Sequence, residues 1–232
     1  MSRMGRIDRT QIVEAALELL DREGLAGVTT RKVAERLGVK SSSLYWHFRD
    51  REELLDLLSD RIVADARWPA PTLEWREQVE ALMIEYLRCL LAHRDAARVA
   101  AGRAPTGPHR LRGAETMLTA LAAAGLSDEE AIDATLVLTT YVVGFALERD
   151  AAADAAKPAS REPSHATAGE QYPTLTRLAD LARGLGPSNR FPQGLALVLD
   201  GIAARLADSG RRGGSGREKR TAKTPRPRAP KS

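Results

Sequence analysis

Two groups of side chains in this 232-residue chain have the types and spacing to do chemistry. In the first, Cys89 and His93 stand four residues apart, so in a helix they would share a face as a nucleophile and its base. No aspartate to orient the histidine is evident, and a free cysteine is usually a small buried apolar group. Two ligands are also too few for a metal site. Because no phosphate loop, metal cluster or nucleophile elbow is present either, we predict no enzyme, no cofactor and no metal site.

The second group is the polar, aromatic and basic run KSSSLYWHFRDR. We predict a helix here from Ser41 to Phe48. At about 100° per residue, Leu44 shares its inner face with Phe48. Ser43 and Trp46 lie on the opposite face, where another helix could cover the tryptophan. Short hydroxyls, hydrogen-bonding aromatic rings and flanking cations suit instead the base edges and phosphates of DNA. The run therefore predicts a DNA recognition helix.

The residues before this run predict a supporting helix and a tight turn. Thr29 can cap the helix by accepting a hydrogen bond from an amide in its opening turn. Val33, Ala34 and Leu37 recur at helical spacing and form one apolar stripe. Gly38 follows at the point where a helix end needs a left-handed residue. Together these signals predict a helix-turn-helix.

Further capping signals define the rest of a three-helix head and the helix that leaves it. Asp8 and Gln11 form a capping box for a first helix that ends near Gly24. Asp50 and Glu53 form another for a fourth helix, which we expect to continue until the prolines at 69 and 71 stop it. This helix would begin beside the DNA and end in the next domain, as a lever.

The remaining apolar periodicity predicts an all-helical second domain. The stretch 127–154 is apolar nearly all round, so it must be covered on more than one side, by its own core and by a second subunit. Residues 155–171, rich in Ala, Pro, Ser and Thr, predict a mobile loop. The helices predicted in this part of the chain span residues 72–93, 111–124, 127–154, 175–185 and 191–206, with a short helix between 94 and 108.

Composition agrees with a helical cytoplasmic protein. Apolar residues make up 43% of the chain but aromatic residues only 4%, and alanine and leucine dominate. The sequence lacks a run of about 18 apolar residues, so we predict no membrane span. Its amino terminus is polar and basic, without the hydrophobic core of a signal peptide. A single cysteine rules out an intrachain disulfide.

Charge is distributed unevenly. Of the total of +4, residues 209–232 contribute +8 and residues 1–49 contribute +3, which leaves −7 for residues 50–208. The two ends can meet a polyanion, whereas the middle would be repelled by one. We therefore expect DNA contact to be confined to the ends.

The run LGVKSSSLYWHFRDREELLD, with TTRK before it, resembles the helix-turn-helix of the TetR family of transcriptional regulators. The likeness covers nearly the whole folded part, 8–207, and includes LLAHRD at 90–95. It implies a homodimer whose last two helices form a four-helix interface, and a repressor that a small molecule releases from operator DNA. The residues and the resemblance together predict DNA contacts at Thr30, Arg31, Lys40, Ser41, Ser42, Ser43, Tyr45, Trp46, His47 and Arg51.

The resemblance also locates an effector site. Members of the family that bind a magnesium chelate use a histidine at the position of Ala100, which cannot hold a metal. We therefore expect a metal-independent, more apolar organic effector, although the same residues could simply fill a core. The predicted effector-binding residues are Leu82, Tyr86, Ala100, Met117 and Tyr141, with Arg67 and Arg103 as anchors for an acidic group.

The sequence thus predicts an all-α protein with three parts. Residues 1–56 form the DNA-binding domain, a three-helix head with the helix-turn-helix. Residues 57–208 form the effector-binding and dimerisation domain, and 209–232 form a disordered basic tail. The predicted function is a homodimeric, ligand-responsive repressor. The alternative is a ligand-independent architectural DNA-binding protein, against which an enclosed apolar cavity in the second domain would count.

Overall fold

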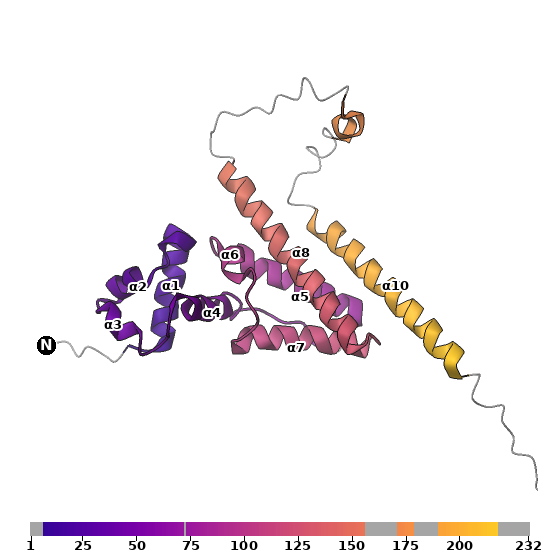
Figure 1. The fold of residues 1–232 in the computed structure, drawn as a ribbon, viewed down its shortest axis with the longest axis horizontal. Helices are drawn as coiled ribbons and strands as arrows, with labels where there is room; N and C mark the ends of the chain where they lie inside the picture. The colour runs from indigo at the N-terminus through magenta and orange to yellow at the C-terminus, as the bar shows by residue number, and fades with distance from the viewer. Residues whose placement is uncertain (1–6, 72, 156–170, 179–189, 218–232) are drawn as a thin grey trace, which may run out of the picture.

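The computed structural model describes residues 7–71, 73–155, 171–178 and 190–217. Throughout these ranges every regular element is a helix and no strand occurs, which confirms the all-α prediction. Helices α1 to α3 form a head at one end, and α4 leads from the head into the remaining helices (Figure 1). The long helices α8 and α10 lie side by side, away from the head.

The head is built by the predicted caps. The Asp8 carboxylate accepts the Gln11 N–H at 2.8 Å, and the Gln11 side chain accepts the Asp8 N–H in return. Thr29 caps the second helix by accepting the Lys32 N–H at 3.3 Å. Gly38 ends that helix in the left-handed conformation, with φ 69°. The elements of the head are α1 (Arg9–Glu23), the 3-10 turn η1 (Leu25–Gly27), α2 (Thr30–Leu37) and α3 (Ser41–Leu44).

The recognition helix is shorter than predicted. Only Ser41–Leu44 is α-helical, and the chain continues through a turn over residues 45–47. Leu44 and Phe48 are nevertheless both buried, so the chain still anchors the two ends of the segment in the core. The α-helix ends early because the Leu44 carbonyl accepts its shorter hydrogen bond from the His47 N–H, at 2.8 Å, in the tighter pattern of a 3-10 turn. The Phe48 N–H, which would continue the α-helix, is 3.4 Å from the same oxygen.

Helix α4 (Arg51–Ile62) begins as predicted and ends early. Asp50 accepts the Glu53 N–H at 2.9 Å. Glu53 does not complete the expected capping box, because its carboxylate accepts the Arg49 N–H at 2.9 Å and pairs with Arg9 at 2.8 Å. The helix stops at Ile62, well before the prolines that were expected to end it. It also crosses the predicted domain boundary after residue 56 as one continuous element.

The second domain packs around a core of buried leucine, valine, methionine and alanine side chains. The capping box at the start of α8 is present, with the Ser127 N–H donating to Glu130 at 3.0 Å and the Glu130 N–H donating to the Ser127 hydroxyl at 3.3 Å. Tyr141 of α8 stacks on Phe191 of α10 at 5.3 Å between ring centroids. The helices are α5 (Trp75–Leu91), α6 (Ala96–Ala100), α7 (Pro108–Ala123), α8 (Asp128–Ala155) and α10 (Phe191–Arg217).

Three predictions concern segments near the carboxyl end. The loop predicted over 155–171 falls almost entirely outside the described residues, as does most of the helix predicted over 175–185, although 173–178 is helical. Residues 209–217 continue helix α10, so the predicted disordered tail does not begin at 209. The rest of that tail, 218–232, lies outside the described residues.

Helix α8 bears on the prediction that the chain has no membrane span. Residues Asp128–Ala152 of α8 are long and apolar enough, by length and composition, to cross a bilayer. The sequence prediction missed them because Thr and Gly interrupt the strictly apolar run without adding charge. A single helix of this kind is weak evidence for a membrane span, since a helix between packed subunits has the same composition.

Candidate DNA-binding surface and effector cavity

The short recognition segment presents its polar face to solvent. Trp46 is 91% exposed and Tyr45 is 57% exposed, whereas Leu44 and Phe48 are buried. Ser42 and Ser43 are also exposed, and Ser41 is half-buried. The predicted division between an inner and an outer face is therefore confirmed, and none of the described helices covers the tryptophan. A large exposed aromatic side chain beside hydroxyl groups is suited to contact with a nucleic acid.

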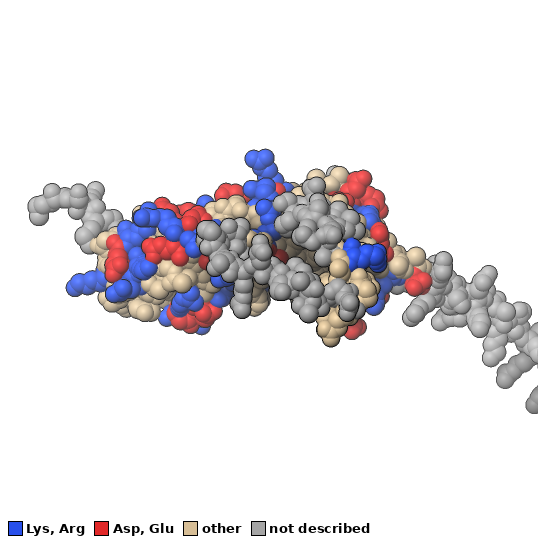
Figure 2. Space-filling model, turned by 90° about the horizontal axis from the view of Figure 1, so that it is seen from above, with Lys and Arg blue, Asp and Glu red and all other residues tan. Residues whose placement is uncertain are grey.

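Some of the cations and polar residues around this segment are exposed, and others are partly buried or hydrogen-bonded within the head. Arg31 is largely exposed and pairs only weakly with Glu35 at 3.6 Å, and Lys40 is exposed. Arg51 instead donates from its guanidinium to the Val28 and Leu25 carbonyls, both at 3.3 Å, so it also holds the turn before α2. Thr30 and His47, also predicted to contact DNA, are half-buried. Basic and acidic side chains are interspersed over the end of the molecule that carries the head (Figure 2).

A hollow that is partly open to solvent lies in the second domain. A cavity of about 740 Å³ is bounded by α5, α7, α8 and the segment that follows α6. This volume is in the range of sites for small organic molecules. Its lining is largely apolar. Five of the seven predicted effector-binding residues line it, and they are Leu82, Tyr86, Ala100, Arg103 and Met117.

The prediction fails for the other two residues. Arg67 lies outside the cavity lining and is exposed, and its backbone N–H donates to Glu85 at 2.6 Å. Tyr141 also lies outside the lining and turns toward α10, where its hydroxyl donates to the Phe191 carbonyl at 3.0 Å. Tyr141 lies about 100° around α8 from its neighbour Thr140, which lines the cavity, so the two residues lie on different faces of the helix, and α10 packs on the face of Tyr141.

Sequence reasoning missed a second group of lining residues. Trp68 follows α4 and packs against Gly113 of α7, where a larger residue would meet its ring. Arg110, in the first turn of α7, faces Tyr86, whose pKa is raised by burial and lowered in part by this arginine. The spacing of threonine and glycine along α8 was a usable signal, because these residues fall at 135, at the adjacent pair 139 and 140, and at 144, about one helical turn apart. The α8 residues concerned are Thr135, Thr139, Thr140 and Gly144.

Arg103 is the most heavily engaged polar residue of the lining. One terminal nitrogen donates to Asp56 at 2.8 Å and the other to Glu52 at 2.6 Å, both on α4. Its Nε is buried and has no hydrogen-bond partner. Burial acts to lower the pKa of Arg103, but the two carboxylates outweigh it and hold that pKa above its usual value. The cavity and the helix that leaves the head are therefore joined by one guanidinium.

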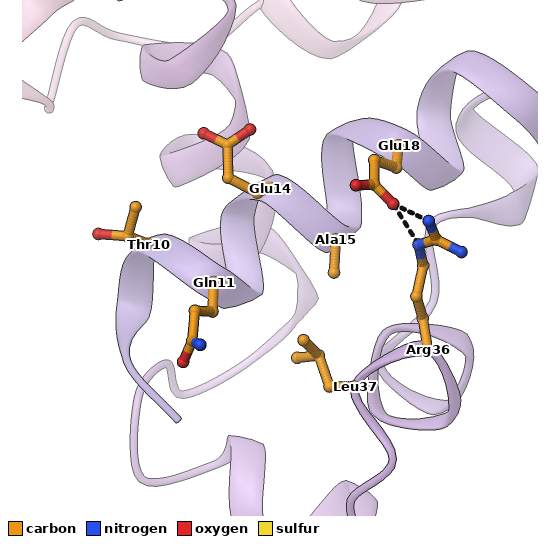
Figure 3. Close-up of a pocket in the computed structure, with 7 residues that line it drawn as sticks. All are labelled: Thr10, Gln11, Glu14, Ala15, Glu18, Arg36 and Leu37. Carbon is orange, nitrogen blue, oxygen red and sulfur yellow. Dashed lines mark hydrogen bonds and ion pairs between the residues drawn. The ribbon is translucent and has the colours of Figure 1, made fainter. Parts of the chain in front are cut away.

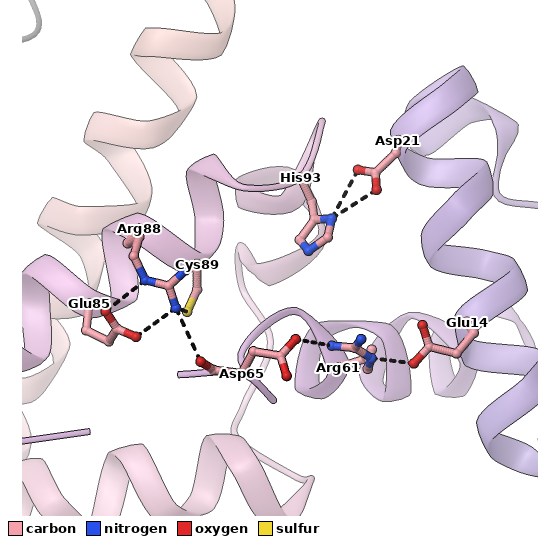
Figure 4. A network of polar contacts seen from close by, with 8 residues as sticks. All are labelled: Glu14, Asp21, Arg61, Asp65, Glu85, Arg88, Cys89 and His93. Carbon is pink, nitrogen blue, oxygen red and sulfur yellow. Dashed lines mark hydrogen bonds and ion pairs between the residues drawn. The ribbon is translucent and has the colours of Figure 1, made fainter. Parts of the chain in front are cut away.

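The cysteine and histidine do not form a catalytic pair. An aspartate does orient the histidine, contrary to the sequence analysis, because Asp21 of α1 lies 3.0 Å from the His93 Nδ1 (Figure 4). The Cys89 sulfur instead lies 3.6 Å from a nitrogen of Arg88. Burial raises the pKa of the Cys89 thiol, which disfavours the nucleophilic thiolate. The network in Figure 4 joins the head to the second domain rather than serving a reaction.

A second hollow lies on the head itself. Its volume is about 470 Å³, and it lies between α1 and the end of α2 (Figure 3). Glu18 and Arg36 form an ion pair on one side of it. Thr10, Gln11 and Leu37 line other parts. Its charged side chains are already paired, Glu18 with Arg36 and Glu14 with Arg61, so the hollow offers no free charge to a ligand.

Comparison with known proteins agrees with this geometry. Residues 12–58 match the family described as "Bacterial regulatory proteins, tetR family", and residues 68–206 match "Tetracyclin repressor-like, C-terminal domain". The chain belongs to the TetR family of bacterial transcriptional regulators. It is an effector-responsive, DNA-binding repressor.

Several relatives extend over most of the chain. The class A tetracycline repressor from transposon 1721 of Escherichia coli is 35% identical over 205 residues, which cover 87% of this chain and 93% of that protein. The repressor DrrR1 of Streptomyces coeruleorubidus is 33% identical over 219 residues, 88% of this chain and 80% of that protein. These relatives are transcriptional regulators and not enzymes, and dimers are typical of the family.

Solved structures give the same picture. Apo ActR from Streptomyces coelicolor has a TM-score of 0.75 and 33% identity, and covers 90% of this chain and 99% of its own. ActR in complex with actinorhodin has a TM-score of 0.73 and 33% identity, with coverage of 86% and 97%. BioQ, crystallised with its double-stranded DNA operator, has a TM-score of 0.64 and 28% identity, with coverage of 85% and 99%.

Proposed function

We propose that this chain acts in the cytoplasm as a homodimer that leaves its operator when a metal-independent, largely apolar organic molecule binds in its second domain. The observation that carries the proposal is the cavity of about 740 Å³ between α5, α7 and α8. An architectural DNA-binding protein has no use for an apolar hollow of this size, because apolar surface left in contact with water is unfavourable. The cavity therefore favours a ligand-responsive repressor over the architectural alternative.

The chemistry of the lining argues against a metal chelate as the effector. Ala100 occupies a position where the resemblance would require a histidine, and its methyl group cannot ligate a metal. Within the described residues no three His, Cys, Asp or Glu side chains gather as a metal site. Magnesium prefers several oxygen ligands, whereas Leu82, Met117 and Ala100 offer none from their side chains. An organic molecule that binds without a metal fits this lining better.

The head supplies the groups for operator recognition. Ser42, Ser43 and Trp46 are exposed together at the recognition segment, and Arg31 and Lys40 lie exposed beside it. We assign base and groove contacts to the first three residues and phosphate contacts to the cations. Tyr45 and His47 are assigned to the DNA backbone.

The dimer interface is assigned to α8 and α10. Each helix packs one buried face against its own subunit and exposes further apolar side chains. On α8, Val137 is 53% exposed, and on α10 Leu197 is 74% exposed. Pairing of these faces across a two-fold axis would cover them and hold two heads at a fixed separation.

The test is a titration of the protein–operator complex. A labelled operator, selected from random DNA with the purified protein, is followed by fluorescence anisotropy. Tetracycline with magnesium is added in one series, and the apolar aromatic acid anthracene-9-carboxylate in another. We expect release by the acid and none by the tetracycline chelate. Release by micromolar tetracycline and magnesium would refute the proposed effector class.

A cavity-filling variant tests whether release acts through this space. Gly144 lines the cavity, and a Cβ there would meet no atom within 4 Å. Gly144→Leu should therefore fill part of the cavity, weaken the acid at least tenfold and leave operator binding intact. Ala122→Leu adds a leucine at an exposed position of α7 outside the lining and should change neither.

A further inference from the structure

Arg103 connects the cavity to α4. Arg103 lines the cavity, yet its two terminal nitrogens both bind carboxylates of α4, those of Glu52 and Asp56. A terminal nitrogen also donates to the Glu52 backbone carbonyl at 3.3 Å. These contacts hold the end of α4 that is nearest the recognition segment. The third donor of the guanidinium, Nε, is buried without a partner.

The opposite end of α4 is fixed to α7. Asp60 is 8% exposed, and its carboxylate accepts the Arg110 N–H at 2.8 Å, in the first turn of α7. Gly107, which precedes α7, lies so close that an added Cβ would overlap the Asp60 carboxyl group. Helix α4 is therefore anchored at its carboxyl end, and at its amino end Arg103 ties it to the cavity wall.

We propose that Arg103 is the residue that detects the effector, and that the effector carries a carboxylate or another anionic oxygen on its apolar body. This inference rests on the proposed function of the cavity. An anion in the cavity binds the Arg103 guanidinium, which then leaves Glu52 and Asp56. The amino end of α4 is no longer held and can move, while the Asp60 end stays fixed. A neutral molecule fills the same space and leaves the two ion pairs in place.

The exchange of partners at Arg103 is favourable because the carboxylates that it leaves are more exposed to water than Arg103 itself. The Glu52 side chain is 67% exposed and that of Asp56 is 36% exposed, so water can solvate both when they lose the arginine. The Arg103 side chain is only 16% exposed, and a ligand anion would meet it away from water, where charge-assisted hydrogen bonds are strong. The guanidinium thus lies between two carboxylates that water can reach and an apolar cavity.

The backbone around Arg103 stays fixed during this exchange. Arg110 donates to the Arg103 carbonyl at 2.8 Å and to the Ala104 carbonyl at 3.1 Å. The Arg110 side chain therefore holds the segment after α6 in place. Arg103 is consequently the lining cation whose side chain changes partners, and Arg110 is the cation that keeps the chain in place.

The experiment compares an acid with its neutral counterpart. Anthracene-9-carboxylate and anthracene-9-carboxamide have nearly the same shape and differ in charge, and their own fluorescence reports binding. We expect the wild-type protein to bind the acid at least about tenfold more tightly than the amide. Only the acid should release the selected operator. Arg103→Gln should abolish the preference while its affinity for the amide stays unchanged.

The matched control is Arg98→Gln. Arg98 lies on α6, pairs with Asp95 at 3.5 Å and does not line the cavity, so this variant should behave as the wild type. Equal affinity for acid and amide in the wild type, or a preference that survives Arg103→Gln, would overturn the inference and leave the proposed function standing. Failure of both molecules to bind would overturn the proposed function itself.

A second variant, Asp56→Asn, distinguishes an exchange of partners at Arg103 from an ion pair that only stabilises the fold. Asp56→Asn removes a competitor for Arg103, so it should tighten binding of the acid several-fold while weakening operator binding without ligand. Its affinity for the amide should not change. An unchanged or weaker affinity for the acid in Asp56→Asn would overturn the inference.

Discussion

At the scale of single residues, the side chains of the head are divided between those left free and those used inside the protein. Trp46 is 91% exposed and takes part in no hydrogen bond within the described structure. Arg51 donates hydrogen bonds to the Val28 and Leu25 carbonyls. Trp46 belongs to the recognition segment and Arg51 follows it, yet a substitution of Arg51 would disturb the turn before α2 as well as any contact with DNA. Trp46 is therefore the cleaner probe of recognition.

The first prediction is that Trp46→Ala and Ser43→Ala each weaken operator binding by about 1–3 kcal/mol, or about five- to 150-fold, without changing the melting temperature. The reason is that neither side chain contributes to the core. Lys40→Ala should weaken selected and random DNA alike and lower the salt dependence by about one unit. If Trp46→Ala melts early but binds normally once folded, the tryptophan belongs to the fold and not to recognition.

The second prediction concerns Glu53 and pH. Hydrogen bonds from the backbone and side chain of Arg49 hold the pKa of Glu53 below its usual value. A lowered folded-state pKa stabilises the head above the unfolded-state pKa, and this contribution is lost as the pH falls through the folded-state pKa. Glu53→Gln should therefore lower the melting temperature near pH 7. The wild type and variant should converge in strong acid, and a difference that grows on acidification would contradict this assignment.

At the scale of elements, α4 acts as the connection between the head and the cavity. Its carboxyl end fits against α7 so closely that Gly107 has no room for a side chain. Asp60 there replaces the side-chain cap that α7 lacks, since Gly107 itself provides none. A glycine and an aspartate 47 positions apart in the sequence thus form one joint between two helices.

The third prediction tests this joint. Gly107→Ala should destabilise the protein by about 1–3 kcal/mol, because the added methyl group overlaps the Asp60 carboxyl group. In an Asp60→Ala background the same change should cost much less, since the carboxyl group is gone. Chemical denaturation of the two single variants and the double variant measures this coupling. Simple additivity of the two changes would show that the residues do not share the space.

At the scale of the whole molecule, the long helices leave apolar surface that one subunit does not cover. Leu199 and Leu195 of α10 are fully buried against the subunit's own core, whereas Leu197 between them is 74% exposed. Val137 of α8 is 53% exposed. A helix that is apolar on two faces can serve a core and a partner at once.

The fourth prediction is that Leu197→Glu converts the dimer to a monomer and abolishes tight operator binding, although the head is unchanged. The charge would be buried at the interface without a partner. Sedimentation at micromolar concentration, with circular dichroism to confirm folding, provides the measurement. Leu111→Glu places the same charge at an exposed leucine of α7 and should leave the dimer intact. A wild-type chain that sediments as a stable monomer would refute the proposed interface.

The sequence by itself determined where the helices of the head begin and which way Trp46 faces, although not where the recognition helix ends. These depend on contacts over three or four residues, such as Asp8 with Gln11 or Thr29 with Lys32, and the sequence contains both partners. The inner face of the recognition segment followed in the same way from the spacing of Leu44 and Phe48. The resemblance then supplied the family and five of the cavity's lining residues.

Only the tertiary structure decided which side chains meet across long separations. Arg103 with Glu52, Asp60 with Arg110, and Asp21 with His93 each join segments at least 50 positions apart, and no local pattern predicts such pairs. Tyr141 was placed in the wrong site for the same reason, because the packing of α10 on α8 fixes its direction. Helical spacing defines a face of a helix, but the neighbouring helix decides whether that face lines a cavity or a core.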